Sequence, residues 1–188
     1  MYMNSSNSIN NSNSVILLGY MGSGKTSIGK ILAKKNNCEF IDLDKVIEKK
    51  YNSSVSKIFS DLGELEFRKI EKQMLNEILN YDHKFILSLG GGTPCYFNNM
   101  DMILSKSNNV FYIKVPTNTL SNRLFLRKKK RPIISNIQSI EKMNEFVSKH
   151  IFERMPFYEK SNYVIESSRN DKELVVKEIL NILSDNGF

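Results

Sequence analysis

The sequence predicts an α/β fold with a five-stranded parallel β-sheet. Short apolar segments alternate with segments of helical periodicity, and the first apolar segment runs directly into a glycine-rich turn. Strands that alternate with helices form parallel sheets, whose ligands lie beyond the carboxyl ends of the strands. We therefore expect the residues that follow each strand to gather at one edge of the molecule.

Five short segments are predicted to form the strands. Residues 15–18 are all apolar, which is typical of a strand buried on both faces. A second strand over 40–44 ends in carboxylates, and a third over 85–89 ends in glycines. The fourth and fifth are predicted over 110–115 and 162–166.

Helical segments lie between these strands. The first contains Ile28 to Leu32, and the second starts near Val46. From Phe67 to Leu79 apolar residues recur at three- and four-residue spacing, which predicts an amphipathic helix. Further helices are predicted over about 117–130, which Pro132 prevents from continuing, over 140–155 and over 172–183.

Length and composition limit the function classes. The chain has 188 residues, the size of one domain, and residues 1–14 are mostly Asn and Ser without the apolar core of a secretory signal. We expect a disordered tail over 1–14 and a single domain over 15–188. No run of 18 apolar residues predicts a membrane span, and two cysteines without zinc spacing favour a reduced, cytoplasmic compartment.

Residues 19–26 read G-Y-M-G-S-G-K-T and match the phosphate-loop pattern G-x-x-x-x-G-K-[ST] at every fixed position. Glycines let backbone N–H groups turn toward phosphate oxygens, and the helix that follows presents its positive N-terminus to the same anion. Lys25 is expected to reach the outer phosphates, and the Thr26 hydroxyl to ligate Mg²⁺. The residues predicted to bind the nucleotide here are Gly22, Ser23, Gly24, Lys25, Thr26 and Ser27.

Asp42 and Asp44 stand at the end of the second predicted strand with one residue between them. On a strand, this spacing points both side chains to the same face. One carboxylate is then suited to hold Mg²⁺ through water and the other to meet a substrate hydroxyl. The alternative is that Asp44 caps the helix that starts near Val46.

Two arginines and a glycine turn are further candidates. Arg68 precedes Glu71 by three residues, and an exposed ion pair is the simplest interpretation of that spacing. Arg154, near a predicted helix end, suits either a carboxylate ligand or the helix C-terminus. The three glycines at 90–92 indicate either close approach of the backbone to a ligand or a plain flexible turn.

Six basic residues crowd into positions 123–131. Part of this run is a solvated face, but Arg131 precedes Pro132, which places it in a loop from which it can close over a phosphate. Between Asp101 and Glu141 the chain has eight basic residues and no acidic one, so its net charge of +7 is concentrated there. We interpret this segment as a local field for a nucleotide.

Taken together, these residues resemble the shikimate kinase family of small P-loop kinases, from residue 15 to about 183. Besides the phosphate loop, the chain carries I-D-L-D-K-V-I-E, G-E-L-E-F-R-K-I-E, L-S-L-G-G-G-T, R-P-I and E-R-M-P-F-Y-E-K in the family's order. The resemblance implies a three-layer P-loop kinase fold, with helices on both faces of the sheet. It also implies a mobile lid at about 123–136 and a substrate-binding helical segment.

The resemblance implies roles for single positions as well. Arg131 and Arg169 would contact the nucleotide, while Thr26 and, through water, Asp42 would hold Mg²⁺. The position of an arginine that stacks on adenine in some members holds Leu124 here. The residues placed in catalysis are Lys25, Asp44 and Arg131.

The matching shikimate-binding positions form a second group. The two arginines of this group would clamp the shikimate carboxylate, and its aspartate would orient or deprotonate the attacking hydroxyl. The residues of this shikimate-binding group are Asp44, Arg68, Gly91, Gly92 and Arg154.

At the adenine site, Arg123 or Arg127 is suited to replace the contact that the arginine of other members makes and that Leu124 lacks.

The implied activity is transfer of the γ-phosphoryl group of MgATP to the 3-hydroxyl of shikimate, a step of chorismate and aromatic amino acid biosynthesis. We expect a cytoplasmic monomer that binds ATP and shikimate, without nucleic acid or membrane. Three alternatives remain: another small-molecule kinase such as a gluconate kinase, a nucleic-acid-binding protein suggested by charge alone, and a relative that binds ligand without catalysis.

Overall fold

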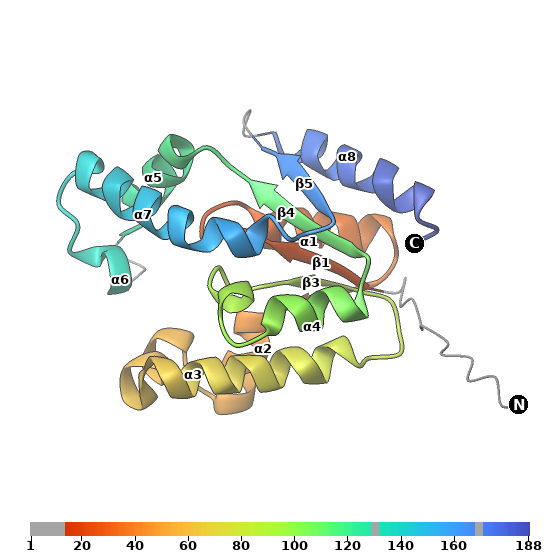
Figure 1. Ribbon diagram of the computed structural model, residues 1–188, viewed down its shortest axis with the longest axis horizontal. Helices are drawn as coiled ribbons and strands as arrows, with labels where there is room; N and C mark the ends of the chain where they lie inside the picture. The colour runs from red at the N-terminus through yellow and green to blue at the C-terminus, as the bar shows by residue number, and fades with distance from the viewer. Residues whose placement is uncertain (1–13, 129–131, 168–170) are drawn as a thin grey trace, which may run out of the picture.

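A computed structural model describes residues 14–128, 132–167 and 171–188. Its five strands are β1 (Ser14–Leu18), β2 (Glu39–Asp42), β3 (Phe85–Ser88), β4 (Asn109–Lys114) and β5 (Tyr163–Glu166). All neighbours pair in parallel, and the order β2-β3-β1-β4-β5 puts β1 at the centre of the sheet (Figure 1). The predicted five-stranded parallel sheet is confirmed.

The core of the molecule surrounds the central strand. Residues 15–18 of β1 have no exposed surface, and β3 is buried along its whole length. Such burial on both faces explains why these strands read as continuous apolar runs in the sequence. Ser14 also belongs to β1 and is buried, so this strand begins one residue before the predicted one. Residues 1–13 lie outside the described residues.

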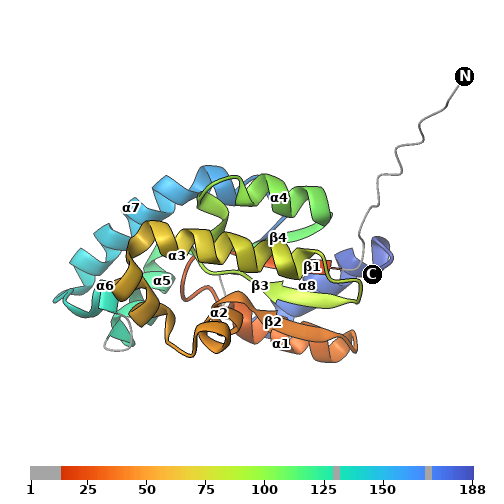
Figure 2. The same ribbon diagram turned by 90° about the horizontal axis from the view of Figure 1, so that it is seen from below.

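Helices cover both faces of the sheet, as the predicted three-layer fold requires. α1 (Lys25–Lys35) and α8 (Lys172–Asp185) pack together on one face, and α3 (Val55–Leu79), α4 (Asn99–Lys106) and α7 (Ile140–Tyr158) lie on the other (Figure 2). α2 (Leu43–Tyr51) packs against α3, and α5 (Thr117–Phe125) against α7. In the part of the chain that the structure describes, no helix is long and apolar enough to cross a membrane.

Three short elements were not predicted from the sequence: α4, α6 (Pro132–Ser135) and the 3₁₀ turn η1 (Thr93–Cys95). α5 also ends at Phe125, whereas the prediction extended to about residue 130. The side chain of Leu126 is 85% exposed, so the chain has left the apolar surface that supports the helix. Arg127 and Lys128, the described start of the basic run that follows, therefore do not continue α5.

The prediction that α7 ends at Met155 is wrong, because the helix continues through Pro156 to Tyr158. Proline removes one backbone N–H, and the carbonyl that loses its partner belongs to Phe152, whose side chain is 75% exposed. Water can satisfy that carbonyl. The fully buried Tyr158 then holds the last turn against the sheet.

A glycine divides α3 into two helical parts. Gly63 has φ 80° and ψ 168°, a conformation that is essentially restricted to glycine, and it is exposed. The first part begins at Val55, where Ser54 caps the helix by accepting from the Lys57 amide. The second part carries Arg68, so the kink sets the direction in which both parts approach the sheet edge.

Replacing Gly63 with alanine is expected to destabilise the fold by about 1–3 kcal/mol, because a Cβ is strained at this backbone conformation. The free space around the position does not relieve that strain, since no atom lies within 4 Å of the added Cβ. Urea denaturation measures the loss, with Ser60→Ala on the same helix as an exposed control. Equal stability of Gly63→Ala and wild type would contradict the assignment of strain.

Candidate active site

The phosphate loop lies between the carboxyl end of β1 and the first turn of α1. Gly22 and Gly24 have φ of 85° and 100°, which only glycine adopts at low cost. The Lys25 ammonium is buried and donates to the carbonyls of Gly19 and Tyr20 at 2.8 and 3.1 Å. The first turn of α1 contains no acidic residue. The loop therefore concentrates positive charge at a helix N-terminus, the arrangement that binds phosphate.

The two aspartates reach the loop by a different route from the one predicted. β2 ends at Asp42, which caps α2 by accepting from the Lys45 amide at 3.4 Å. Asp44 therefore stands in the first turn of α2; it neither lies on the strand nor caps the helix. Asp42 also accepts from the Thr26 hydroxyl at 2.9 Å, which joins the start of α2 to the phosphate loop.

Both aspartates line one pocket of about 250 Å³ together with the phosphate loop and the glycine turn. Burial raises the pKa of the Asp44 carboxyl to about 6, and the negative charges of Asp42 and Glu71 add to this effect while Lys25 opposes it. A carboxyl with a pKa near neutrality is suited to accept a proton from a substrate hydroxyl. The other residues that line this pocket include Ser27, Ser88 and Gly91.

Arg68 is held in a buried network, and the expectation of an exposed ion pair is wrong. Its guanidinium donates to Glu71 at 2.9 Å, and Glu71 is only 1% exposed. Glu71 also accepts from the Thr93 hydroxyl at 2.7 Å. The ring of Tyr96 lies under the guanidinium, with its centroid 4.1 Å from Cζ. Among the described residues, the buried Nε of Arg68 has no hydrogen-bond partner.

The glycine turn after β3 lets these side chains converge, so the plain flexible turn is not the better interpretation. A Cβ on Gly90 would lie 3.1 Å from an Asp44 carboxylate oxygen and 3.0 Å from Glu71. A Cβ on Gly92 would lie 2.7 Å from the Arg68 guanidinium. Side chains at these positions would occupy the space where charged groups meet.

Arg154 reaches the same turn from α7, one turn before the end of that helix. Its Nη1 would lie 3.6 Å from a Cβ on Gly91. Its guanidinium lies over the ring of Tyr20, with Cζ 5.3 Å from the ring centroid. The Tyr158 hydroxyl, one turn further along α7, donates to the Gly91 carbonyl. The two predicted arginines thus approach the glycine turn from opposite sides.

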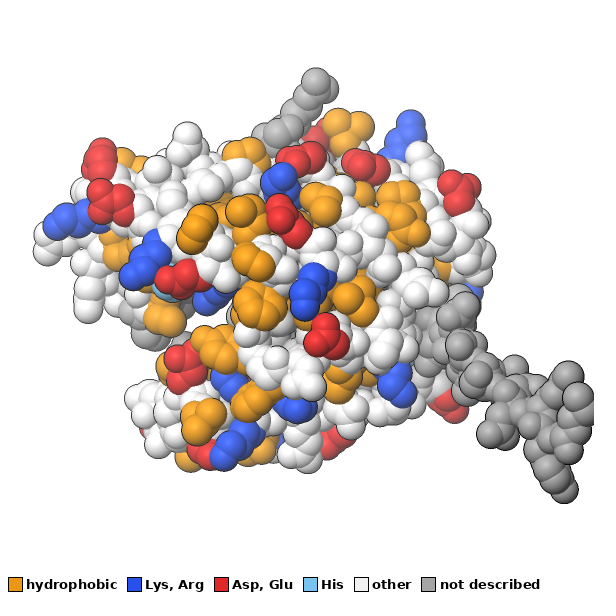
Figure 3. Space-filling view, in the orientation of Figure 1, with side chains coloured by type: hydrophobic (Ala, Val, Ile, Leu, Met, Phe, Trp, Pro, Cys, Tyr) orange, Lys and Arg blue, Asp and Glu red, His pale blue; other side chains and the backbone are white. Residues whose placement is uncertain are grey.

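A larger pocket of about 840 Å³ opens beside the first and is lined by Val55, Phe59, Arg127 and Ile133. Figure 3 shows the molecule hollowed between the helices of the predicted lid side and α3. The predicted contacts Arg131 and Arg169 lie outside the described residues, so the structure describes no position for them. Arg127 lines both pockets. The sequence indicated this arginine only as an alternative adenine contact.

Sequence reasoning missed the residues that hold the arginines in place. Glu71 falls within the apolar stripe of α3, four residues after Phe67 and four before Leu75, and this position could have indicated its burial. Tyr20 and Tyr158 gave no comparable signal. The first occupies a free position of the loop pattern, and the second follows a proline that predicted the end of the helix.

A family model described as Shikimate kinase matches residues 21–184. The chain belongs to the shikimate kinase family. A shikimate kinase from Flavobacterium johnsoniae is 42% identical over 171 residues, which cover 90% of this chain and 98% of that relative. The resemblance inferred from the motifs is confirmed.

Solved structures of the family agree with the fold. Shikimate kinase from Bacteroides thetaiotaomicron matches with a TM-score of 0.83 and 32% identity, covering 91% of this chain and 98% of that chain. Shikimate kinase from Acinetobacter baumannii in complex with shikimate matches with a TM-score of 0.82 and 29% identity, covering 93% and 94%. The predicted P-loop kinase fold is thereby confirmed.

Asp44→Asn is expected to stabilise the ligand-free protein at pH 7.5. The folded state raises the pKa of Asp44 from 3.8 to about 6, so folding favours the neutral carboxyl, and ionisation above pH 6 costs stability. An amide removes that cost, which is on the order of 1–3 kcal/mol. Urea denaturation at pH 7.5 and pH 4.5 should show a gain that shrinks at the lower pH.

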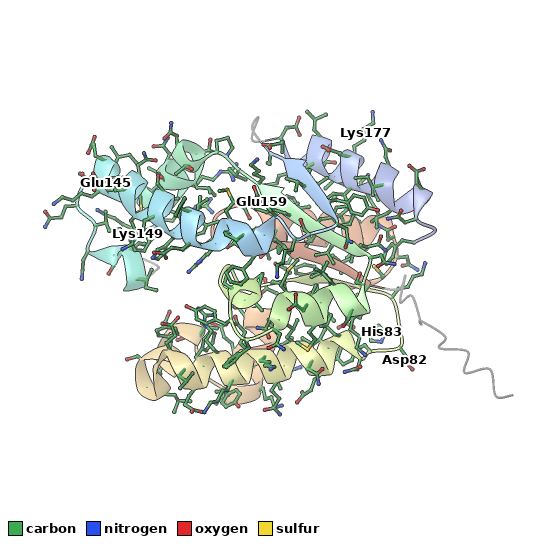
Figure 4. The ribbon with its side chains drawn as sticks, in the orientation of Figure 1. Asp82, His83, Glu145, Lys149, Glu159 and Lys177 are labelled. Atoms are coloured by element: carbon green, nitrogen blue, oxygen red, sulfur yellow. The ribbon has the colours of Figure 1, made fainter. Side chains whose placement is uncertain are left out.

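The matched control is Asp82→Asn, which replaces a fully exposed carboxylate at the far end of α3 from the site (Figure 4). It should change stability by less than about 0.5 kcal/mol at either pH. A stability gain for Asp44→Asn that is equal at both pH values would show that ionisation is not its cause.

Proposed function

We propose that this chain transfers the γ-phosphoryl group of ATP to the 3-hydroxyl of shikimate, giving 3-phosphoshikimate and ADP. This reaction is a step of chorismate and aromatic amino acid biosynthesis. The observation that carries the proposal is the convergence of Arg68 and Arg154 on the glycine turn next to Asp44 and the phosphate loop. Membership of the shikimate kinase family supports the same conclusion.

The phosphate loop is proposed to hold the triphosphate of ATP. Backbone N–H groups from residue 22 onward face the phosphates, and Lys25 neutralises charge on the outer ones. This lysine already lies among the carbonyls of Gly19 and Tyr20, so little reorganisation is needed. Phosphoryl transfer depends mainly on such alignment and charge neutralisation.

Thr26 and Asp42 are the residues that would hold Mg²⁺. Mg²⁺ prefers oxygen ligands, retains several waters and takes few direct protein ligands. The side-chain oxygens of Thr26 and Asp42 lie 2.9 Å apart beside the loop, which fits one direct hydroxyl contact and one carboxylate contact through water. When bound there, the ion would supply positive charge that stabilises the transferring phosphoryl group.

The acceptor is proposed to lie between the arginines and Asp44. Shikimate carries one carboxylate, and two guanidiniums that approach from opposite sides can bind it with several charge-assisted hydrogen bonds. Asp44 then faces the ring hydroxyls. The bond from the 3-oxygen to γ-phosphorus forms as the bond to the β-phosphate oxygen breaks, and the hydroxyl proton passes to the Asp44 carboxylate.

A third pocket, of about 730 Å³, is proposed to hold the adenine. It lies between the phosphate loop, the end of α5 and the start of α8, and Arg123, Leu124 and Arg127 line it. The Arg123 guanidinium donates to the Gly22 carbonyl at 2.9 Å, which anchors it to the loop. Arg127 is therefore the better candidate to stack on the base in the place of Leu124.

The lid over about 123–136 is proposed to close over the bound nucleotide and to bring Arg131 to the phosphates, which would exclude water as a competing acceptor. Arg169 is proposed as a further nucleotide contact. We propose that the chain acts as a monomer in the cytoplasm without nucleic acid or membrane. Its two free cysteines are compatible with a reduced compartment.

The experiment that tests the function is ADP release from MgATP with shikimate, gluconate, nucleoside monophosphates or water as acceptor. Shikimate should stimulate release at least about a hundredfold over water, because it alone fills the site between the arginines and Asp44. Lys25→Ala should abolish the stimulation, whereas Lys30→Ala, exposed on the same helix, should retain it. Stimulation by gluconate or a nucleotide in place of shikimate would refute the proposal.

A further inference from the structure

One face of α7 joins the phosphate loop to the glycine turn. Phe146, His150, Arg154 and Tyr158 are spaced four residues apart and therefore lie along one side of the helix. The ring of Phe146 packs on that of His150 at a centroid distance of 4.1 Å. His150 and Arg154 both contact Tyr20, and the Tyr158 hydroxyl donates to the Gly91 carbonyl of the glycine turn.

Tyr20 presents its two ends to different parts of the site. Its backbone belongs to the phosphate loop, where its carbonyl accepts from Lys25 and from the Ser23 amide at 3.1 Å. Its side chain is only 1% exposed and points toward α7, where the hydroxyl meets Nδ1 of His150 at 3.1 Å. The phosphate-loop pattern leaves this position free, so phosphate binding does not by itself require an aromatic ring there.

The two arginines of the site are held in different ways. Arg68 forms ion pairs with Glu71 and Glu64, so part of its charge is already balanced. Among the described residues, no carboxylate forms an ion pair with Arg154; the face of Tyr20 lies beside its guanidinium, and the Tyr158 hydroxyl also interacts with it. A ring face restrains the guanidinium plane and leaves its N–H edge for a planar, bidentate ligand.

We propose that Tyr20 is the positioning residue for Arg154: its ring fixes the guanidinium plane so that the N–H edge meets the shikimate carboxylate, and its hydroxyl bond to His150 fixes the ring. This inference rests on the proposed function. Tyr20 touches neither reacting group through its side chain and acts on shikimate only through Arg154.

The charges around His150 favour the hydrogen bond that this arrangement uses. Burial lowers the pKa of the His150 imidazole, and the positive charges of Arg154 and Lys149 lower it further, while Glu153 opposes them. The ring is therefore neutral at pH 7.5. In its Nε2–H tautomer, a neutral imidazole accepts at Nδ1 from the Tyr20 hydroxyl.

A double-mutant cycle tests the proposal, with kcat/KM for shikimate measured by ADP release at saturating MgATP and pH 7.5. Tyr20→Leu should lower kcat/KM about 3- to 30-fold, the factor expected for loss of a cation–π contact, with the KM for ATP unchanged. In the background of Arg154→Ala the same substitution should change kcat/KM less than about twofold, because its target is gone. Tyr20→Phe retains the ring and should therefore retain most of the wild-type kcat/KM for shikimate.

Several results would overturn the proposal. An equal loss from Tyr20→Leu in both backgrounds, or a rise in the KM for ATP in place of the loss on shikimate, would assign Tyr20 a purely structural role in the loop. A loss in Tyr20→Phe as large as in Tyr20→Leu would assign the effect to the hydroxyl. If Tyr20→Leu does not fold, Tyr20→Met supplies the same cycle. Failure of the wild type to use shikimate would refute the proposed function, and with it the ligand named here, whereas the outcomes above, in an enzyme that uses shikimate, would overturn this inference alone.

Discussion

Parallel pairing at the centre of the sheet is the constraint on which the site depends. β1 and β2 both pair with β3, and the register places Leu17 and Asp42 opposite Ser88. The segments that follow these three strands therefore leave the sheet at the same level and in the same direction. One continues as the phosphate loop, one as the start of α2 and one as the glycine turn. No side-chain contact is needed to bring these segments together, because backbone hydrogen bonds already do so.

The negative charges that crowd at this edge of the sheet repel one another, and this repulsion helps to raise the pKa of one carboxyl. The carboxylates of Asp42, Asp44 and Glu71 lie near one another. Two of them have a hydrogen-bond partner: Asp42 accepts from the Thr26 hydroxyl, and Glu71 accepts from the Arg68 guanidinium. Asp44 is left as the carboxyl on which burial and repulsion act, and its pKa rises accordingly. Functional sites commonly retain such destabilising arrangements. Here the arrangement leaves one carboxyl able to exchange a proton near neutral pH.

Much of the fold and part of the site could be predicted from the sequence. The central strands were predictable because burial on both faces leaves a continuous apolar run, and the phosphate loop because its residues are neighbours in the chain. Asp44 was predicted to reach the site along a strand, whereas the cap formed by Asp42 turns the chain into α2 first. The burial of the Arg68–Glu71 pair depends on how α3 packs, which spacing along one helix does not determine. The same holds for Tyr20, whose partners lie 130 and more residues away.

The central claim is that Asp44 must be ionised for the shikimate hydroxyl to accept the phosphoryl group, because its carboxylate takes up the hydroxyl proton. The most direct test is the pH dependence of kcat/KM for shikimate at saturating MgATP, because this quantity follows ionisation in the enzyme before shikimate binds. The account predicts that kcat/KM falls as the pH drops below about 6, and that Glu71→Gln moves this limb to lower pH by removing one of the negative charges that raise the pKa of Asp44. A profile that stays flat down to pH 5, or a limb that does not move in Glu71→Gln, would contradict it.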